Sequence, residues 1–153
     1  MKYSKYDYST EDSLMYYEFF SEGPKGRVRK LVEYSSTNLK NVYNLAFGDY
    51  DETTGGINDK SITNNGDSQM VLATVASTVY AFTNRYPDAW VHATGSTSVR
   101  TRLYRMGITT NLIEISEDFL VYGLKGDKWV EFIVGEDYEA FLITRKNRNI
   151  KID

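Results

Sequence analysis

The residues best suited to binding a ligand gather where a strand is expected to meet a helix: Gly95, Ser96, Thr97 and Arg102. The first N–H groups of a helix lack partners within the helix and act together as roughly half a positive charge, so they attract anions. Glycine lets a backbone approach a ligand closely, hydroxyls donate hydrogen bonds, and an arginine fork fits a phosphate or a carboxylate. The junction therefore predicts an anion-binding site, to which His92 and Arg100 could also contribute.

The same junction also fits an ordinary helix start. Ser and Thr are preferred N-caps, and glycine is common in the loop before a helix. A helix beginning near Thr97 or Ser98 places an apolar stripe on its inner face, formed by Val99, Leu103 and Met106. Arg102 flanks that stripe, and Arg100 lies further round the helix. A capped helix and an anion site centred on Arg102 both stay open.

Other catalytic and metal-binding patterns fail on residue type or spacing. The chain has no cysteine and one histidine, which excludes thiolate chemistry, cysteine-ligated zinc and two-histidine metal sites within one chain. A calcium loop starting at Asp49 would have Thr54 in place of the required glycine and Lys60 in place of the glutamate. Phosphate-loop and dinucleotide-binding glycine patterns are missing. We therefore expect no metal and no cofactor, and favour a protein that is not an enzyme.

Charge is distributed unevenly along the 153 residues, although the net charge is only −3. Residues 48–67 are acidic, residues 95–106 hold three arginines, and residues 145–151 are basic. The bases at 25–30, with thirteen tyrosines in the chain, would suit nucleic acid, but the acidic balance argues against strong binding to a phosphate backbone. An anionic ligand or another protein, including a second copy of this chain, is the favoured partner.

Hydrophobic spacing predicts an α+β fold with a largely antiparallel sheet and the order β-β-β-α-β-α-β-β-β. Strands are expected at 15–21, 27–34, 42–47, 89–94, 119–124, 129–134 and 138–145. One long helix, 68–86, carries an apolar stripe that should pack across the sheet, and a shorter helix over 98–106 ends at Gly107. Residues 109–115 favour a short third helix, and residues 48–66 a long polar loop.

Length and composition predict a single domain over residues 1–153, with a basic tail, 146–153, that is expected to be disordered. No apolar run is long enough to cross a membrane, and no signal peptide is recognisable at the start. We therefore expect a cytoplasmic protein without a membrane partner.

The chain resembles an uncharacterised bacterial family, a domain of unknown function found mainly in Bacteroidetes-type genomes. The resemblance covers nearly the whole chain and is carried by six stretches: Gly23 to Gly26, Val42 to Asp49, Tyr80 to Phe82, Gly95 to Thr97, Arg100 to Tyr104, and Tyr138 to Phe141. It implies a bacterial origin and no particular mechanism.

The function that the sequence favours is a small non-catalytic binding or interaction module with an anion-accepting junction between strand and helix. One alternative is a hydrolase or transferase acting on a phosphate-bearing small molecule, with His92 as its base. Another is a nucleic-acid-binding component of a bacterial defence or toxin–antitoxin system.

Overall fold

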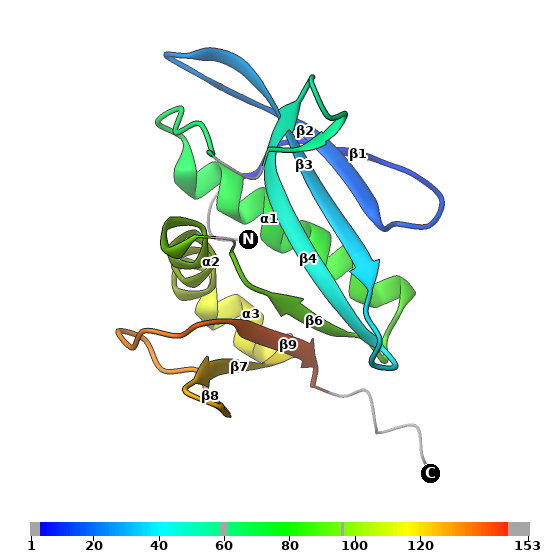
Figure 1. Cartoon of the computed structure of the whole chain (residues 1–153), viewed down its shortest axis with the longest axis vertical. Helices are drawn as coiled ribbons and strands as arrows, with labels where there is room; N and C mark the ends of the chain where they lie inside the picture. Colours follow the sequence, from blue (N-terminus) through cyan, green and yellow to red (C-terminus); the bar gives the residue numbers. More distant parts are fainter. Residues whose placement is uncertain (1–3, 59–60, 96, 147–153) are drawn as a thin grey trace.

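The computed structural model describes residues 4–58, 61–95 and 97–146, which form an α+β fold (Figure 1). Ser96, Asp59, Lys60 and the tail 147–153 lie outside the described residues. The helices are α1 (Ser68–Arg85), α2 (Ser98–Thr110) and α3 (Leu112–Asp118). The strands are β1 (Ser9–Thr10), β2 (Tyr16–Gly23), β3 (Gly26–Ser36), β4 (Val42–Asp51), β5 (Gly56–Ile57), β6 (Trp90–Ala93), β7 (Phe119–Lys125), β8 (Lys128–Glu131) and β9 (Phe141–Arg145).

Most strand pairs are antiparallel, as the sequence predicts. Along the sheet the strands lie in the order β1-β2-β3-β4-β6-β9-β7-β8, and β5 pairs with the end of β4. The pair β4–β6 is parallel, and α1 lies in the crossover that connects these two strands. The last strand, β9, enters between β6 and β7 and pairs with both.

The expected order of elements is wrong in detail. Strands β1 and β5 add two pairings of only two residues each, which are too short to produce a period in the sequence. Strand β4 continues to Asp51, into the segment expected to be a loop. Helix α2 continues through Gly107 to Thr110, and at Gly107 it approaches α1 so closely that a Cβ there would lie 3.2 Å from Leu72 Cδ2.

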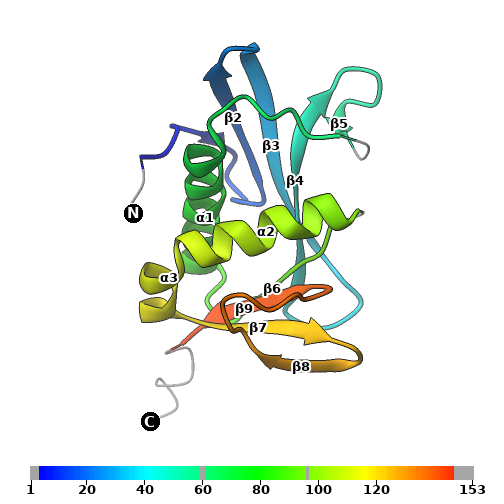
Figure 2. The same ribbon diagram turned by 90° about the vertical axis from the view of Figure 1, so that its left-hand side faces the viewer.

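Three helices, rather than one long helix alone, cover one face of the sheet (Figure 2). Helix α1 buries the predicted stripe, which includes Leu72, Val75, Val79 and Phe82. The Phe82 ring stacks on Tyr34 of β3 with 4.1 Å between ring centroids. Helix α1 ends at Arg85, two residues before Pro87, in agreement with the sequence prediction. The hydrophobic core lies between these helices and the sheet.

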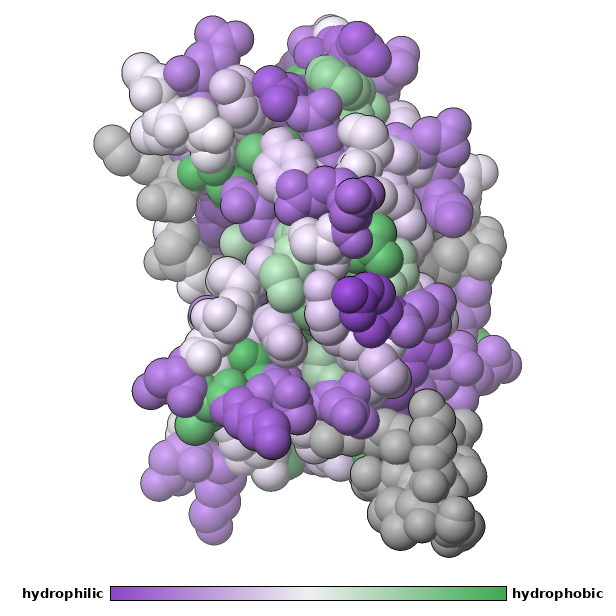
Figure 3. All heavy atoms as spheres, turned by 90° about the vertical axis from the view of Figure 1, so that its right-hand side faces the viewer, coloured by the Kyte–Doolittle hydropathy of each residue, from purple (hydrophilic) through white to green (hydrophobic). Residues whose placement is uncertain are grey.

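The opposite face of the sheet is open (Figure 3). On it polar residues dominate, and hydrophobic residues gather only in small groups. The alternation of β6 buries Val91 and Ala93 against the helices and leaves Trp90 and His92 half-buried on the open face.

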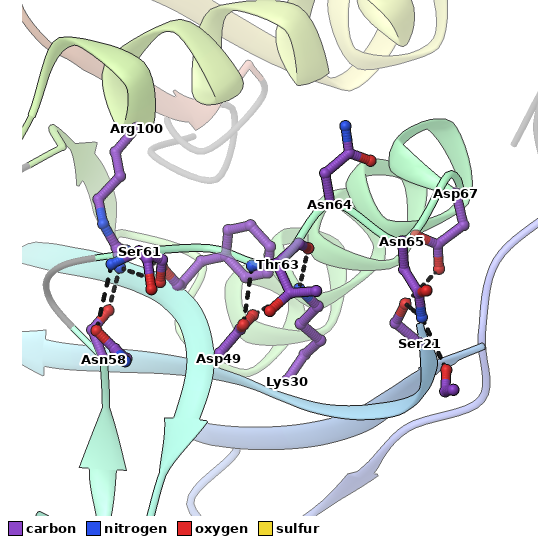
Figure 4. Close-up of polar contacts among 12 residues, drawn as sticks. Ser21, Lys30, Asp49, Asn58, Ser61, Thr63, Asn64, Asn65, Asp67 and Arg100 are labelled. Atoms are coloured by element: carbon purple, nitrogen blue, oxygen red, sulfur yellow. Dashed lines mark hydrogen bonds and ion pairs between the residues drawn. The ribbon is translucent and has the colours of Figure 1, made fainter. Parts of the chain in front are cut away.

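Residues 61–67, which lead from β5 to α1, are held by buried polar side chains (Figure 4). The Lys30 ammonium, 1% exposed, donates to Asp49 Oδ1 at 2.5 Å and to the Thr63 carbonyl at 2.9 Å. Asp49 Oδ2 in turn accepts the backbone N–H of Thr63. Buried Asn65 donates to Ser21 and to the Gly26 carbonyl, which ties the segment to the turn between β2 and β3. A stretch that the composition marks as polar loop is therefore fixed to the sheet.

Replacing Lys30 with methionine should lower the free energy of unfolding by about 3 kcal/mol, because the Asp49 carboxylate would stay buried without its cation. Urea denaturation followed by circular dichroism measures the change. The matched control is Lys128→Met on exposed β8, which should cost about 0.5 kcal/mol or less. Equal effects of the two substitutions would contradict the structural role of the Lys30–Asp49 pair.

Buried tyrosines should make the fold sensitive to alkali. Burial is the main cause that raises the pKa of Tyr104 to about 12, from an ordinary value near 10. A pKa raised on folding means that the stability contributed by the neutral ring is complete below pH 10 and is lost as the pH rises toward 12. Tyrosinate absorbance and circular dichroism, recorded together, should show unfolding in this range, and Tyr104→Phe should move it to higher pH. Full ionisation of all tyrosines near pH 10 with the fold intact would contradict this assignment.

Candidate anion-binding groove

Arg100 lies in the first turn of α2 and is 7% exposed. Its guanidinium donates three hydrogen bonds, all to backbone carbonyls. Nη1 donates to the Phe47 carbonyl at 2.7 Å, and Nη2 donates to the carbonyls of Asn58 and Ser61. Figure 4 shows the side chain reaching from α2 to these carbonyls. One arginine thus connects a helix, a strand and the segment after β5.

The position of Arg100 follows from the different lengths of β4 and β6. The parallel pairing ends at Leu45 and Ala93, whereas β4 runs on to Asp51. Phe47, two residues past the last pair, needs a donor for its carbonyl, and Nη1 supplies it. Gly48 leaves room for this arrangement, because a Cβ there would lie 3.0 Å from Nη1. Arg100 therefore takes the place of a missing neighbouring strand.

The positive charge of Arg100 has no counterion among the described residues. None of their carboxylates lies within ion-pair distance of its guanidinium, and its buried Nε–H has no hydrogen-bond partner among them. A buried cation is expensive unless an opposite charge lies nearby. This site would therefore gain from an anion.

Arg100 forms part of a groove of about 560 Å³ between α2, the start of α1 and residues 61–64. This volume falls within the range of small-molecule sites, roughly 300–1,000 Å³. The described lining residues are Lys30, Phe47, Ser61, Ile62, Thr63, Asn64, Asp67, Ser68, Val71, Leu72, Thr97, Val99, Arg100, Arg102, Leu103 and Met106.

Two helix N-termini reach this groove. The Thr97 side chain caps α2 by accepting the Arg100 N–H at 3.2 Å. Asp67 precedes α1 but makes no cap; its carboxylate accepts the hydroxyls of Tyr6 and Ser21, each at 2.6 Å. Neither helix has an acidic residue in its first turn. The N-terminus of α2 therefore adds partial positive charge to the groove, whereas the Asp67 carboxylate offsets that of α1.

The predicted site residues do not all meet. Thr97, Arg100 and exposed Arg102 line the groove together. Gly95 serves packing, because a Cβ there would lie 2.4 Å from the Arg100 Cβ and 2.5 Å from the Thr101 nitrogen. Ser96 lies outside the described residues.

His92 lies on the open face of the sheet, away from the groove. Its Nδ1 is 2.9 Å from the Asn44 amide oxygen, and its ring meets Trp129 edge to face. Burial lowers the pKa of His92, so the neutral ring is favoured. The strand alternation separates this histidine from Arg100 and Arg102.

The sequence analysis missed the apolar wall of the groove. Val99, Leu103 and Met106 were expected to face inward, but α2 instead buries Arg100, Tyr104 and Ile108. Both sets of residues have helical spacing, so the period alone could not choose between them. The polar segment 61–64 carries no motif that would have marked it as the facing wall.

Arg102 also borders a second, polar hollow of about 390 Å³, lined in part by Ser98, Thr101 and Arg105. There Arg105 forms an ion pair with exposed Asp137. Of the three arginines in α2, only Arg102 is both exposed and without a hydrogen-bond or ion-pair partner among the described residues. It is therefore the arginine best placed to reach a ligand.

Within the described residues, no group of three or more histidine or acidic side chains could hold a metal ion. No described helix has the length and apolar character needed to cross a membrane.

The chain belongs to DUF6934, a family of unknown function whose model matches residues 2–146. No curated protein and no solved structure matches the chain.

Gly95→Ala should destabilise the fold by about 1–3 kcal/mol, because the added methyl group would collide with the backbone of α2. The control is Gly56→Ala, where the nearest atom lies 4.0 Å from the new Cβ. Thermal unfolding of both variants measures the difference. A Gly95→Ala protein as stable as the control would mean that this glycine has no packing role.

Proposed function

We propose that this member of a family without an assigned function is a non-catalytic binding module that holds an anionic ligand in the groove between α1 and α2. Arg102 and the N-terminal turn of α2 contact the anion. Arg100, buried behind them, contributes its positive charge. Thr97 and Gly95 shape the turn that presents these groups.

The observation that carries this proposal is the buried Arg100, which has no counterion among the described residues. Its hydrogen bonds all go to backbone carbonyls, which carry no full negative charge, and its Nε–H has no hydrogen-bond partner among the described residues. Two unit charges about 4 Å apart interact by about 4 kcal/mol at an effective dielectric constant of 20, so a bound anion would be favoured appreciably. The N-terminus of α2 acts in the same direction.

The groove supports binding rather than hydrolysis or group transfer. Its single described carboxylate, Asp67, already accepts two hydroxyl groups. His92, the candidate base, lies on the other face of the sheet. A general base must come within hydrogen-bond reach of the proton that it removes, and neither residue is placed for that.

The basic residues do not favour a nucleic-acid surface. Lys25 and Arg27 lie at the turn between β2 and β3, at one end of the molecule, whereas Arg145 ends β9 near the other end (Figure 1). Arg145 donates hydrogen bonds to Tyr80, Thr83 and Asn84 of α1.

A bacterial source, which the family resemblance implies, stays a prediction.

The test is a thermal-unfolding screen of the full chain with inorganic phosphate, sulfate, acetate and hexanoate at low ionic strength. At least one anion should raise the Tm of the wild type, since a ligand that binds only the folded state stabilises it. Arg102→Gln should abolish the shift. Because Arg102 is exposed, the Tm of the ligand-free variant should stay close to that of the wild type.

The matched control is Arg27→Gln, which removes an exposed arginine outside the groove. Its response to anions should equal that of the wild type. No anion-dependent shift in the wild type, or equal shifts in the wild type and Arg102→Gln, would reject the proposed function.

A further inference from the structure

The groove has an apolar wall that the fold leaves uncovered. Val99, Leu103 and Met106 repeat along α2 at helical spacing and line the groove. Val99 is 61% exposed and Met106 is 37% exposed, whereas Tyr104 and Ile108 on the inner face of α2 are buried. Ile62 and Val71 add apolar surface on the facing side. A ligand with an apolar body would remove this surface from water.

The charge of the groove matches a single negative charge. Its lining includes three cations: Lys30, Arg100 and Arg102. Asp49 neutralises Lys30, and the Asp67 carboxylate lies in the lining as well. Among the described residues, three cations against two carboxylates leave one positive charge. A monoanion would balance it, whereas a polyphosphate would bring an excess of negative charge.

The polar groups Thr97, Arg100 and Arg102 lie toward the start of α2, and the apolar stripe continues beyond them to Met106. Thr97 and Arg100 lie at the first turn, and the apolar stripe extends from Val99 to Met106, a length of about 10 Å at the rise of an α-helix. At the far end, Leu72 lines the groove and also a small apolar cavity of about 50 Å³ beneath it. The groove therefore fits an elongated ligand with its charge at one end.

We propose that the ligand is an amphiphilic monocarboxylate with a medium-length aliphatic chain. Its carboxylate lies beside Arg102 and the first turn of α2, and its chain runs along Val99, Leu103 and Met106 toward Leu72. This assignment rests on the proposed function, since it names the chemical class of the anion held at the same groove.

Isothermal titration calorimetry with the full chain tests it, using butanoate, hexanoate, octanoate and decanoate below their micellar concentrations. Affinity should rise about fourfold with each added methylene until the apolar wall is covered. Decanol, which has the same chain length without the charge, should bind at least about tenfold more weakly than decanoate. Inorganic phosphate should bind more weakly than octanoate.

Two sets of variants test separately the contacts of the ligand's carboxylate and those of its aliphatic chain. Arg102→Gln should lower the affinity for decanoate and leave the affinity for decanol unchanged. Val99→Gln and Met106→Gln are both at exposed positions. They should reduce the gain in affinity with chain length and leave the affinity for butanoate unchanged. Ile113→Gln on α3 is the control, because this side chain is 83% exposed and lies outside the groove lining.

The results distinguish a failure of this assignment from a failure of the proposed function. One outcome is that carboxylates of every chain length bind with the same affinity as phosphate, and that this binding depends on Arg102. In that case the anion-binding function is supported and the amphiphile assignment is rejected. Decanol binding as tightly as decanoate, or tighter binding of a peptide that ends in apolar residues, would also overturn the assignment. Absence of binding by every anion would remove both proposals.

Discussion

The guanidinium of Arg100 keeps α2 in its place on the sheet. Strand β4 is longer than its parallel neighbour β6, and the excess leaves carbonyls that need donors in a region from which water is largely excluded. Arg100 supplies donors to Phe47 on the strand and to Asn58 and Ser61 beyond β5. One side chain therefore links both walls of the groove, α2 and the segment after β5.

A second buried cation, Lys30, is treated differently by the fold. Its charge is matched by Asp49, and the two side chains together hold Thr63 through its N–H and its carbonyl. Among the described residues, the buried Lys30 thus has a counterion, whereas the buried Arg100 in the groove wall has none. A fully paired buried charge is inert toward ligands, whereas an unpaired one attracts them, and this difference places the binding potential at α2.

Elements with a local signal could be predicted from the sequence. The stripe of α1 repeats through Leu72, Val75, Val79 and Phe82, and Pro87 marks its end, so the helix follows from neighbouring residues alone. The hairpin of β7 and β8 likewise turns at Gly126 and Asp127, as its spacing indicates. The α+β class and the mainly antiparallel sheet follow from such signals.

The site depended on contacts between distant segments, and the sequence predicted it only in part. Helix α2 has two stripes that both fit helical spacing, and the burial of Tyr104 and Ile108 is decided by the sheet and by α1. The partners of Arg100 lie about forty to fifty residues away in sequence, where no motif points to them. The separation of His92 from the junction was available from the alternation of β6, since Val91 and Ala93 are the apolar members of that strand.

The insertion of β9 between β6 and β7 has a consequence for the growing polypeptide on the ribosome. Strands β2, β3 and β4 pair with their nearest neighbours in sequence, so this meander can form early. Strand β6, in contrast, has an unsatisfied edge until Phe141–Arg145 has been synthesised, because its second neighbour is β9, which follows two helices and a hairpin in the sequence. Translation must therefore have passed Arg145 before this sheet can close, and the nascent chain carries an exposed strand edge until that moment.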